Sequence, residues 1–252
     1  LASQYIANLP AEEGRAGELD DLLSRHKNIA AVIVEPLLQG AAGMRMHDEA
    51  TLRRIRTACD RHGALLIFDE IFTGFGRLGG MFAAELSGVT PDIITLGKAL
   101  TGGVTPLAAT VASQRVYDAF HADEFTKALM HGPTYMGHAL GCAAANASLD
   151  LFETEPRMAQ VADMEQHFNA TLQPLANLSQ VADVRIRGSV AAVDMRDAFD
   201  LNALRRRFIE QGVFIRPIGR TIYLAPAYTI GMDDLSTLTD AIGRAVATLE
   251  LK

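Results

Sequence analysis

The chain contains 252 residues, of which 49% are hydrophobic and 21% are charged, and its 30 acidic and 23 basic side chains give a formal net charge of −7. This hydrophobic fraction excludes an intrinsically disordered chain, and the acidic balance argues against non-specific nucleic-acid binding, which needs clustered Lys and Arg. The two cysteines, Cys59 and Cys142, are too few for a disulfide framework and show no metal-ligand spacing, so a reducing, cytoplasmic compartment is the simplest expectation.

The first part of the chain alternates apolar runs with a helical pattern. Four continuous apolar runs are typical of strands, and they span residues 29–36, 64–70, 91–98 and 106–113. Between the first two runs, residues 48–63 place Leu52, Ile55 and Cys59 on one stripe of a helix that stops at Gly63. Continuous rather than alternating runs indicate strands covered on both faces, so we expect an α/β layer with a mostly parallel sheet.

Residues 128–149 carry no Asp, Glu, Lys or Arg, and this length raises the question of a membrane span. The polar and helix-breaking residues between His131 and His138 argue against a span. We therefore expect a buried loop followed by a helix of small residues.

The second part of the chain has the pattern of a smaller α+β domain. Helical patterns cover residues 138–173, with a break near Glu155-Pro156, and later residues 200–211 and 233–250. Short strand patterns come in two pairs, 181–188 with 190–195 over Gly188-Ser189, and 213–217 with 221–226. We place the boundary near residue 155, which gives a large domain over residues 1–155 and a small domain over residues 156–252.

Two chemically active side chains end neighbouring apolar runs of the first part. Asp69 ends the run ALLIFDE, and Lys98 ends the run PDIITLGK. Ligands of open parallel sheets bind beyond the carboxyl ends of the strands, where we expect Lys98 to be partly desolvated and Asp69 either to meet a cation or to cap a helix. Together the pair matches the demands of pyridoxal 5′-phosphate, which needs a lysine for its aldehyde and an acid for its ring nitrogen.

Two further segments are candidates for anion binding. The segment HGPTYMGH (131–138) combines backbone donors with Thr134 just before a helix, as phosphate sites do, although a structural loop has the same pattern. Arg216 lies among apolar residues in VFIRPIGR (213–220), where a buried guanidinium needs a fixed anionic partner. That partner could equally be a protein carboxylate or a substrate carboxylate.

These residues, in this order, resemble the class III pyridoxal-phosphate aminotransferases. The segments LLIFDEIFTGFGRLG (65–79) and PDIITLGKALTGG (91–103) resemble the two core motifs of that family. The resemblance implies the fold type I of pyridoxal-phosphate-dependent transferases, with a partial large domain and a smaller C-terminal α+β domain. Residues 29–47, 130–149, 181–188 and 212–228 resemble the family members of biotin synthesis, which implies 8-amino-7-oxononanoate as amino acceptor and S-adenosylmethionine as amino donor.

The resemblance also implies roles in cofactor binding. Lys98 would form the Schiff base with pyridoxal 5′-phosphate and then act as the acid and base of the proton shift, and Asp69 would pair with the pyridinium nitrogen. Pro133 and Thr134 would contact the cofactor phosphate, in this family from the neighbouring subunit of a homodimer.

The resemblance implies a second set of roles at the substrate. Gly132 would lie beside the substrate, and Arg216 would bind its carboxylate. Tyr223 and Arg77 would lie nearby.

One departure from the family pattern concerns the N-terminal side. The chain begins Leu1-Ala2-Ser3 rather than with Met, so we expect a fragment or a processed piece. Family members extend further on that side, with a Gly-Ser phosphate contact, a ring-stacking aromatic residue and aromatic pocket walls. Two alternatives therefore stay open: another class III ω-amine aminotransferase or aminomutase, or a catalytically incomplete fragment that acts as a non-enzymatic subunit.

Overall fold

The computed structural model describes residues 4–10 and 17–248, and every structural statement below concerns those residues. Contacts between Cα atoms divide the chain into two compact units, which are described separately. The first unit holds residues 1–38, 47–75 and 82–150, and the second holds residues 39–46, 76–81 and 151–252. The domain boundary expected near residue 155 stays a prediction.

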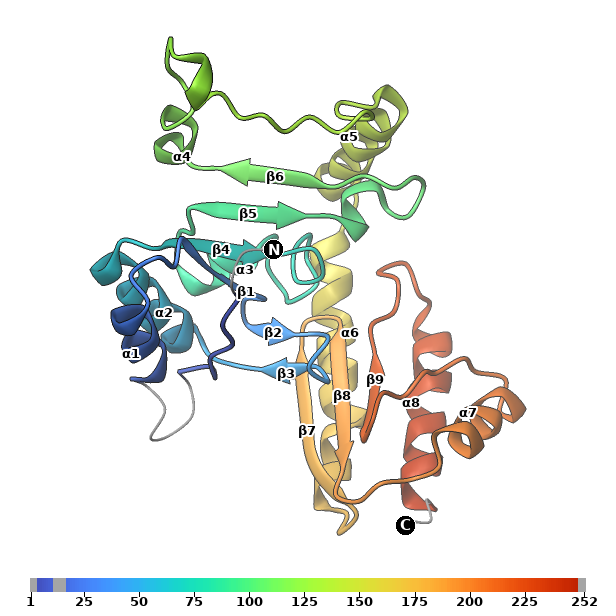
Figure 1. The fold of residues 1–252 in the computed structure, drawn as a ribbon. Helices are drawn as coiled ribbons and strands as arrows, with labels where there is room; N and C mark the ends of the chain where they lie inside the picture. The colour runs from blue at the N-terminus through green and yellow to red at the C-terminus, as the bar shows by residue number, and fades with distance from the viewer. Residues whose placement is uncertain (1–3, 11–16, 249–252) are drawn as a thin grey trace. The chain divides into compact units, whose positions relative to one another are not determined.

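The first unit is built on a four-stranded sheet (Figure 1). In sheet order its strands are β1 (Ala31–Val34), β4 (Leu65–Asp69), β5 (Ile93–Leu96) and β6 (Ala109–Ala112). The first three are parallel, and β6 is antiparallel to β5, which confirms the mostly parallel α/β sheet.

Helix α2 (Glu49–His62) of the first unit confirms the helix predicted over residues 48–63, and the unit holds further helices that were not predicted from the sequence. Its helices are α1 (Glu18–Arg25), α2, α3 (Ala83–Ser87), α4 (Gln114–Asp118), the 3₁₀ helices η1 (Lys98–Thr101) and η2 (Phe125–Lys127), and α5 (Ala139–Thr154), which continues into the second unit. The Asp48 carboxylate caps α2 by accepting a hydrogen bond from the Thr51 amide at 2.7 Å, and Gly63 ends it in the left-handed conformation. The predicted stripe of Leu52, Ile55 and Cys59 is fully buried.

The expectation that the strands are covered on both faces is wrong for this chain. In β4, Leu66 and Phe68 are buried, whereas Leu65 and Ile67, which point to the opposite face, are only partly buried. On the edge strands β1 and β6, Ile33 is 63% exposed and Val111 is 53% exposed. Continuous apolar runs therefore do not distinguish a fully enclosed strand from one with a single covered face.

The uncharged segment 128–149 differs from its predicted form in its first half. Residues 128–137 are exposed, so the expected buried loop is wrong, and the expected small-residue helix is present as α5. In the part of the chain that the structure describes, no helix has the length and hydropathy needed to cross a membrane.

The second unit packs helices on an antiparallel sheet of order β7-β8-β9. Its elements are β2 (Leu38–Gln39) paired with β3 (Arg45–Met46) at its border, α6 (Arg157–Thr171), the 3₁₀ helix η3 (Gln173–Asn177), β7 (Val181–Arg187), β8 (Val190–Met195), α7 (Leu201–Glu210), β9 (Thr221–Leu224) and α8 (Met232–Ala247). The sequence-predicted hairpin over Gly188-Ser189 and the break at Glu155-Pro156 are confirmed. The predicted end of the last helix, Glu250, lies outside the described residues.

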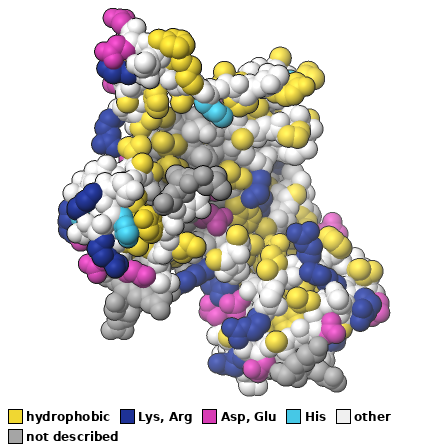
Figure 2. All heavy atoms as spheres, viewed as in Figure 1, with side chains coloured by type: hydrophobic (Ala, Val, Ile, Leu, Met, Phe, Trp, Pro, Cys, Tyr) yellow, Lys and Arg dark blue, Asp and Glu magenta, His cyan; other side chains and the backbone are white. Residues whose placement is uncertain are grey.

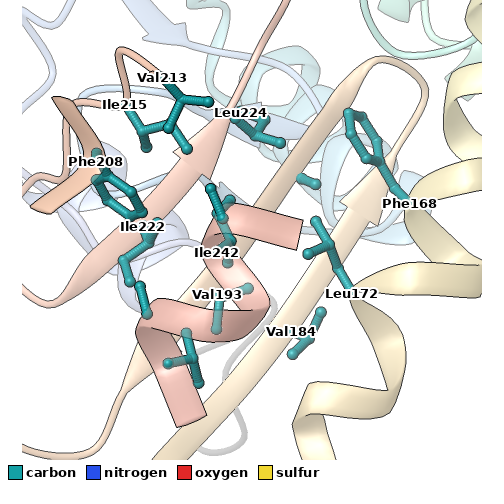
Figure 3. Packing of buried hydrophobic residues seen from close by; sticks show 14 of the residues in the cluster. Phe168, Leu172, Val184, Val193, Phe208, Val213, Ile215, Ile222, Leu224 and Ile242 are labelled. Carbon is teal, nitrogen blue, oxygen red and sulfur yellow. The ribbon is translucent and has the colours of Figure 1, made fainter. Parts of the chain in front are cut away.

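The core of the second unit is a single cluster of buried hydrophobic side chains (Figure 3). Phe168 and Leu172 from the α6 end face Val193 from β8 and Ile242 from α8. Burial of such side chains contributes about 1.5–3 kcal/mol each, so this cluster stabilises the second unit.

The expected strand pair of residues 213–217 and 221–226 does not form. Residues 213–217 are in no strand, β9 pairs with β8 instead, and an isolated bridge joins Ile218 to Thr221. Pro217 has no amide hydrogen to donate to a ladder, which explains why pairing stops at this bridge.

Candidate functional site

Asp69 is the last residue of β4, at the carboxyl edge of the sheet in the first unit. Its side chain is half-buried, and its Oδ1 accepts hydrogen bonds from the Ile71 amide at 3.1 Å and from the Thr95 hydroxyl at 3.3 Å. Thr95 lies directly opposite Asp69 in the parallel register of β4 and β5. No hydrogen bond to Oδ2 is formed by the described residues, so this oxygen can accept from a further donor.

Lys98 begins η1, two residues after β5 ends. Its φ of 46° is in the left-handed region, which is uncommon for a residue with a side chain and marks a backbone held by its surroundings. The side chain is exposed, so the expected partial desolvation is wrong. Lys98 follows the end of β5 at Leu96 and the extended residue Gly97, and the described part of the chain leaves its side chain uncovered.

The segment after Asp69 packs against the segment that carries Lys98. A Cβ on Gly97 would lie 3.3 Å from Cγ2 of Ile71, and Nζ of Lys98 lies 5.0 Å from the centre of the Phe72 ring. Because β4 and β5 are parallel neighbours, the structure brings Asp69 and Lys98 to the same edge of the sheet. This is the arrangement expected from the sequence, and the catalytic roles of the two residues stay predictions.

Glu70 is a buried carboxylate that the sequence reasoning missed. Its oxygens accept hydrogen bonds from the amides of Ala83 at 2.7 Å and Ala84 at 3.0 Å and from the Thr73 hydroxyl at 3.3 Å. Burial raises its pKa, although these three donors oppose the rise. The side chain therefore ties the loop after β4 to the start of α3. The adjacent pair Asp69-Glu70 was the available signal, since two neighbouring carboxylates at a strand end rarely share one environment.

The predicted phosphate segment lies in the first unit as an exposed turn before α5. Gly132, Pro133 and Thr134 are exposed, and the Met136 amide donates to the Pro133 carbonyl at 2.9 Å. None of these three residues contacts Asp69 or Lys98 in a hydrogen bond within the described chain. Their binding roles stay predictions.

Arg77 belongs to the second unit and is held by three contacts there. Its Nη1 donates to the Ser189 hydroxyl at 2.8 Å and to the Pro226 carbonyl at 2.8 Å, and its guanidinium lies 4.6 Å from the centre of the Tyr228 ring. Burial lowers its pKa. These contacts fix the Gly-rich loop 76–81 on the β7–β8 turn, and the expected position near substrate stays a prediction.

Arg216 and Tyr223 are also in the second unit. Arg216 is exposed, so the interpretation of a buried guanidinium among apolar residues is wrong. The cause is alternation: Val213, Ile215 and Pro217 point inward, which leaves Arg216 on the outer side of the same extended segment. Arg216 lines an open cavity of about 510 Å³ together with Arg205, and Tyr223 is half-buried in β9, opposite Ala192.

Comparison with known proteins gives one consistent result. The family model described as aminotransferase class-III matches residues 5–246. Adenosylmethionine-8-amino-7-oxononanoate aminotransferase of Buchnera aphidicola (Acyrthosiphon pisum) is 40% identical over 239 residues, which cover 92% of this chain and 56% of that protein. The chain spans about half the length of the curated relatives it matches.

Two solved structures show the same likeness in three dimensions. The adenosylmethionine-8-amino-7-oxononanoate aminotransferase of Methanocaldococcus jannaschii has a TM-score of 0.90 at 34% identity, covering 100% of this chain and 61% of that one. An amine transaminase from an uncultivated Pseudomonas species, solved in a PLP-bound form, has a TM-score of 0.86 at 37% identity. The match covers 94% of this chain and 56% of that chain.

Proposed function

Because the chain belongs to the class III aminotransferases, we propose that it is the lysine-bearing part of an enzyme that transfers an amino group from S-adenosylmethionine to 8-amino-7-oxononanoate. The observation that carries this proposal is the placement of Asp69 and Lys98 at one edge of the sheet, after neighbouring parallel strands. Proteins of this family use pyridoxal 5′-phosphate, and a cytoplasmic setting is part of the proposal.

The side chains at this edge fit pyridoxal 5′-phosphate. When bound, this cofactor supplies an electron sink, which makes the proton beside the transferred nitrogen removable. Lys98 offers an exposed amine for the aldehyde group, and Asp69 offers a carboxylate with Oδ2 available for the ring N–H. In the reaction, Lys98 would move the proton between two carbons, and Asp69 would keep the ring nitrogen protonated.

The cofactor phosphate would be bound by Pro133 and Thr134 of a second copy. The exposed position of the Thr134 hydroxyl supports this assignment, since it leaves the hydroxyl available to another molecule. Around it the first unit exposes large apolar side chains, namely Phe125, Leu129, Met130, Tyr135, Met136 and Leu140. We call these six residues the apolar patch. Figure 2 shows hydrophobic side chains gathered over α4 and α5. Several large apolar side chains exposed in one region are typical of an interaction surface, which supports a homodimer.

The substrate carboxylate would be bound by Arg216, with Gly132, Tyr223 and Arg77 nearby. The exposure of the Arg216 guanidinium beside an open cavity supports the role, because a planar fork of donors can bind a carboxylate in two parallel hydrogen bonds.

A second candidate function differs in the amino donor. The amine transaminase from an uncultivated Pseudomonas species is nearly as similar to this chain as the biotin-pathway relatives are. The chain would then belong to an ω-amine aminotransferase with the same residues at the sheet edge.

Steady-state assays on the whole enzyme that contains this chain test the proposal. We expect turnover of 8-amino-7-oxononanoate with S-adenosylmethionine, and a KM for the keto acid at least tenfold higher in Arg216→Met, because a charge-assisted hydrogen bond contributes about 1.5–3 kcal/mol. Turnover with simple amines but none with S-adenosylmethionine would select the second candidate. Absence of any transamination would refute both.

A further inference from the structure

The Phe72 ring lies close to the Lys98 amine. Nζ of Lys98 lies 5.0 Å from the centre of this ring, within the 6 Å at which a cation is attracted by the negative face of a ring. Within the described chain, this is the specific contact that the Lys98 amine makes, since no hydrogen bond or ion pair to it is present there.

The loop that carries Phe72 is fixed on both sides of the ring. Before it, the Ile71 amide donates to Oδ1 of Asp69 at 3.1 Å, and the Ile71 side chain is close to Gly97. After it, the Thr73 hydroxyl donates to the buried carboxylate of Glu70 at 3.3 Å. The ring is half-buried and stands on an anchored backbone, so it can hold a flexible side chain in place.

A ring is a suitable holder for an amine that must gain and lose a proton. A carboxylate in the same place would accept a hydrogen bond and form a salt bridge that the amine would have to break. The face of Phe72 attracts the ammonium group without accepting its proton, and it contacts the neutral amine by dispersion alone. The position of Nζ would therefore be kept in both protonation states.

We propose that Phe72 is a positioning residue for Lys98 and that the face of the Phe72 ring holds the amine at the sheet edge that also carries Asp69. The proposal rests on the function proposed for Lys98, and it assigns a role to a side chain outside the expected cofactor and substrate contacts. It predicts that an aromatic ring at residue 72, rather than its volume, determines where the amine lies.

The direct test is an NMR measurement on the whole enzyme without cofactor, labelled with ¹³C at the lysine ε-carbon. Lys98→Arg identifies the Lys98 signal, and Lys127, which pairs with Glu124, serves as an internal reference. We expect an upfield ring-current shift of the Lys98 ε-protons that is lost in Phe72→Leu and Phe72→Met and kept in Phe72→Tyr. Phe120→Leu, which removes an exposed ring elsewhere in the first unit, is the matched control.

A kinetic measurement on the same variants separates positioning from general damage. With cofactor bound, Phe72→Leu is expected to lower kcat about two- to fivefold, the factor that a cation–π contact of this exposure supplies, with the KM for the amino donor unchanged. Phe72→Tyr and Phe120→Leu are expected to match the wild type.

Two results would overturn the proposal: a Lys98 signal that is the same in Phe72→Leu and Phe72→Met as in the wild type, or an unchanged or higher kcat in both variants. If the enzyme shows no transamination at all, the proposed function fails, and the NMR shift alone then decides whether the ring holds the amine.

Discussion

Two adjacent carboxylates at the end of β4 are used in opposite ways. Asp69 is half-buried and keeps one oxygen available, whereas Glu70 is fully buried and has three donors around it. The alternation of side chains along an extended backbone explains the difference, because neighbouring residues point to opposite sides. One residue therefore serves the candidate site, and the next one fixes the loop that surrounds it.

Glu70→Gln is expected to lower the free energy of unfolding by about 1–3 kcal/mol, because the amide side chain has a single acceptor for the Ala83 and Ala84 amides.

The same variant should change the pH dependence of stability. Burial raises the pKa of the Glu70 carboxyl above 4.5, so the native state binds more protons than the unfolded state between pH 4.5 and the raised pKa. Wild-type stability therefore falls as pH rises through that window, and the variant should lose this dependence. Urea titrations across pH 4 to 8 measure both effects.

The control for this measurement is Glu85→Gln, because Glu85 is exposed on the same short helix, α3. It should change the unfolding free energy by less than about 0.5 kcal/mol. Equal losses in the two variants, or an unaltered pH dependence in Glu70→Gln, would contradict the role given to the buried carboxylate.

At the level of elements, the sequence was informative where a local signal sets the structure. The stop of α2 at Gly63 and the hairpin over Gly188-Ser189 both follow from short-range chemistry. Alternation along its own extended segment explains the exposure of Arg216, whereas the exposure of Lys98 depends on what covers that residue from elsewhere in the fold. The same reason accounts for the loop 128–137, predicted as buried and found exposed.

Gly188 tests the contact between the loop 76–81 and the β7–β8 turn. It has a φ of 55°, and an added Cβ would lie 2.6 Å from backbone atoms of Arg77, Leu78 and Gly79. Gly188→Ala should therefore lower the free energy of unfolding for two reasons. A side chain in the left-handed conformation costs about 1–2 kcal/mol, and overpacking against the loop costs about a further 1–3 kcal/mol. Gly212→Ala, with a φ of 77° and open space, should cost the strain alone. Thermal unfolding compares them, and equal shifts in Tm would argue against this contact.

Asp92 joins three elements of the first unit. Its carboxylate accepts from Arg56 at 2.9 Å, from Arg115 at 2.9 Å and from the Leu66 amide at 2.8 Å. Burial opposes ionisation, yet the Leu66 amide and the Arg56 guanidinium lower the pKa below 3.8 overall. The ionised group thus adds stability above pH 3.8, and this stability is lost as pH falls through the lowered pKa.

Asp92→Asn is expected to lower the free energy of unfolding by about 1–3 kcal/mol at neutral pH, because two guanidinium groups lose their charged partner. Arg56 also pairs with Asp60, and the Asp60 side chain is 65% exposed. Asp60→Asn should therefore lower the free energy of unfolding by less than about 0.5 kcal/mol. Chemical denaturation at pH 7 measures the free energy of unfolding of both variants. Equal losses in Asp92→Asn and Asp60→Asn would contradict the stabilising role given to Asp92.

At the scale of the whole molecule, the chain forms two compact units, and the first carries the apolar patch. The second unit has a closed hydrophobic core of its own (Figure 3). A patch that exposes Phe125 and Tyr135 by 80% and 79% would be costly in water, which is why we assign it to contact with a second copy.

Thiol labelling tests this assembly. Cys142 is exposed on α5, whereas Cys59 is buried, and burial raises the pKa of its thiol to about 11. In the whole enzyme, a second copy bound at the patch should also shield Cys142, so this thiol should react slowly in the wild type and rapidly when Tyr135→Glu disrupts the patch. Cys59 should be unreactive in both proteins. The dimer would be contradicted if Cys142 reacts at the same rate in wild type and variant and if sedimentation gives the mass of a monomer for both proteins.

The most direct measurement is the identity of the lysine that takes the cofactor. The whole enzyme is incubated with pyridoxal 5′-phosphate, reduced with borohydride, digested and analysed by mass spectrometry. The account predicts a single modified peptide that contains Lys98, and no visible absorbance band from bound cofactor in Lys98→Ala. A modification at Lys27 or Lys127, or a reducible band that persists in Lys98→Ala, would contradict it.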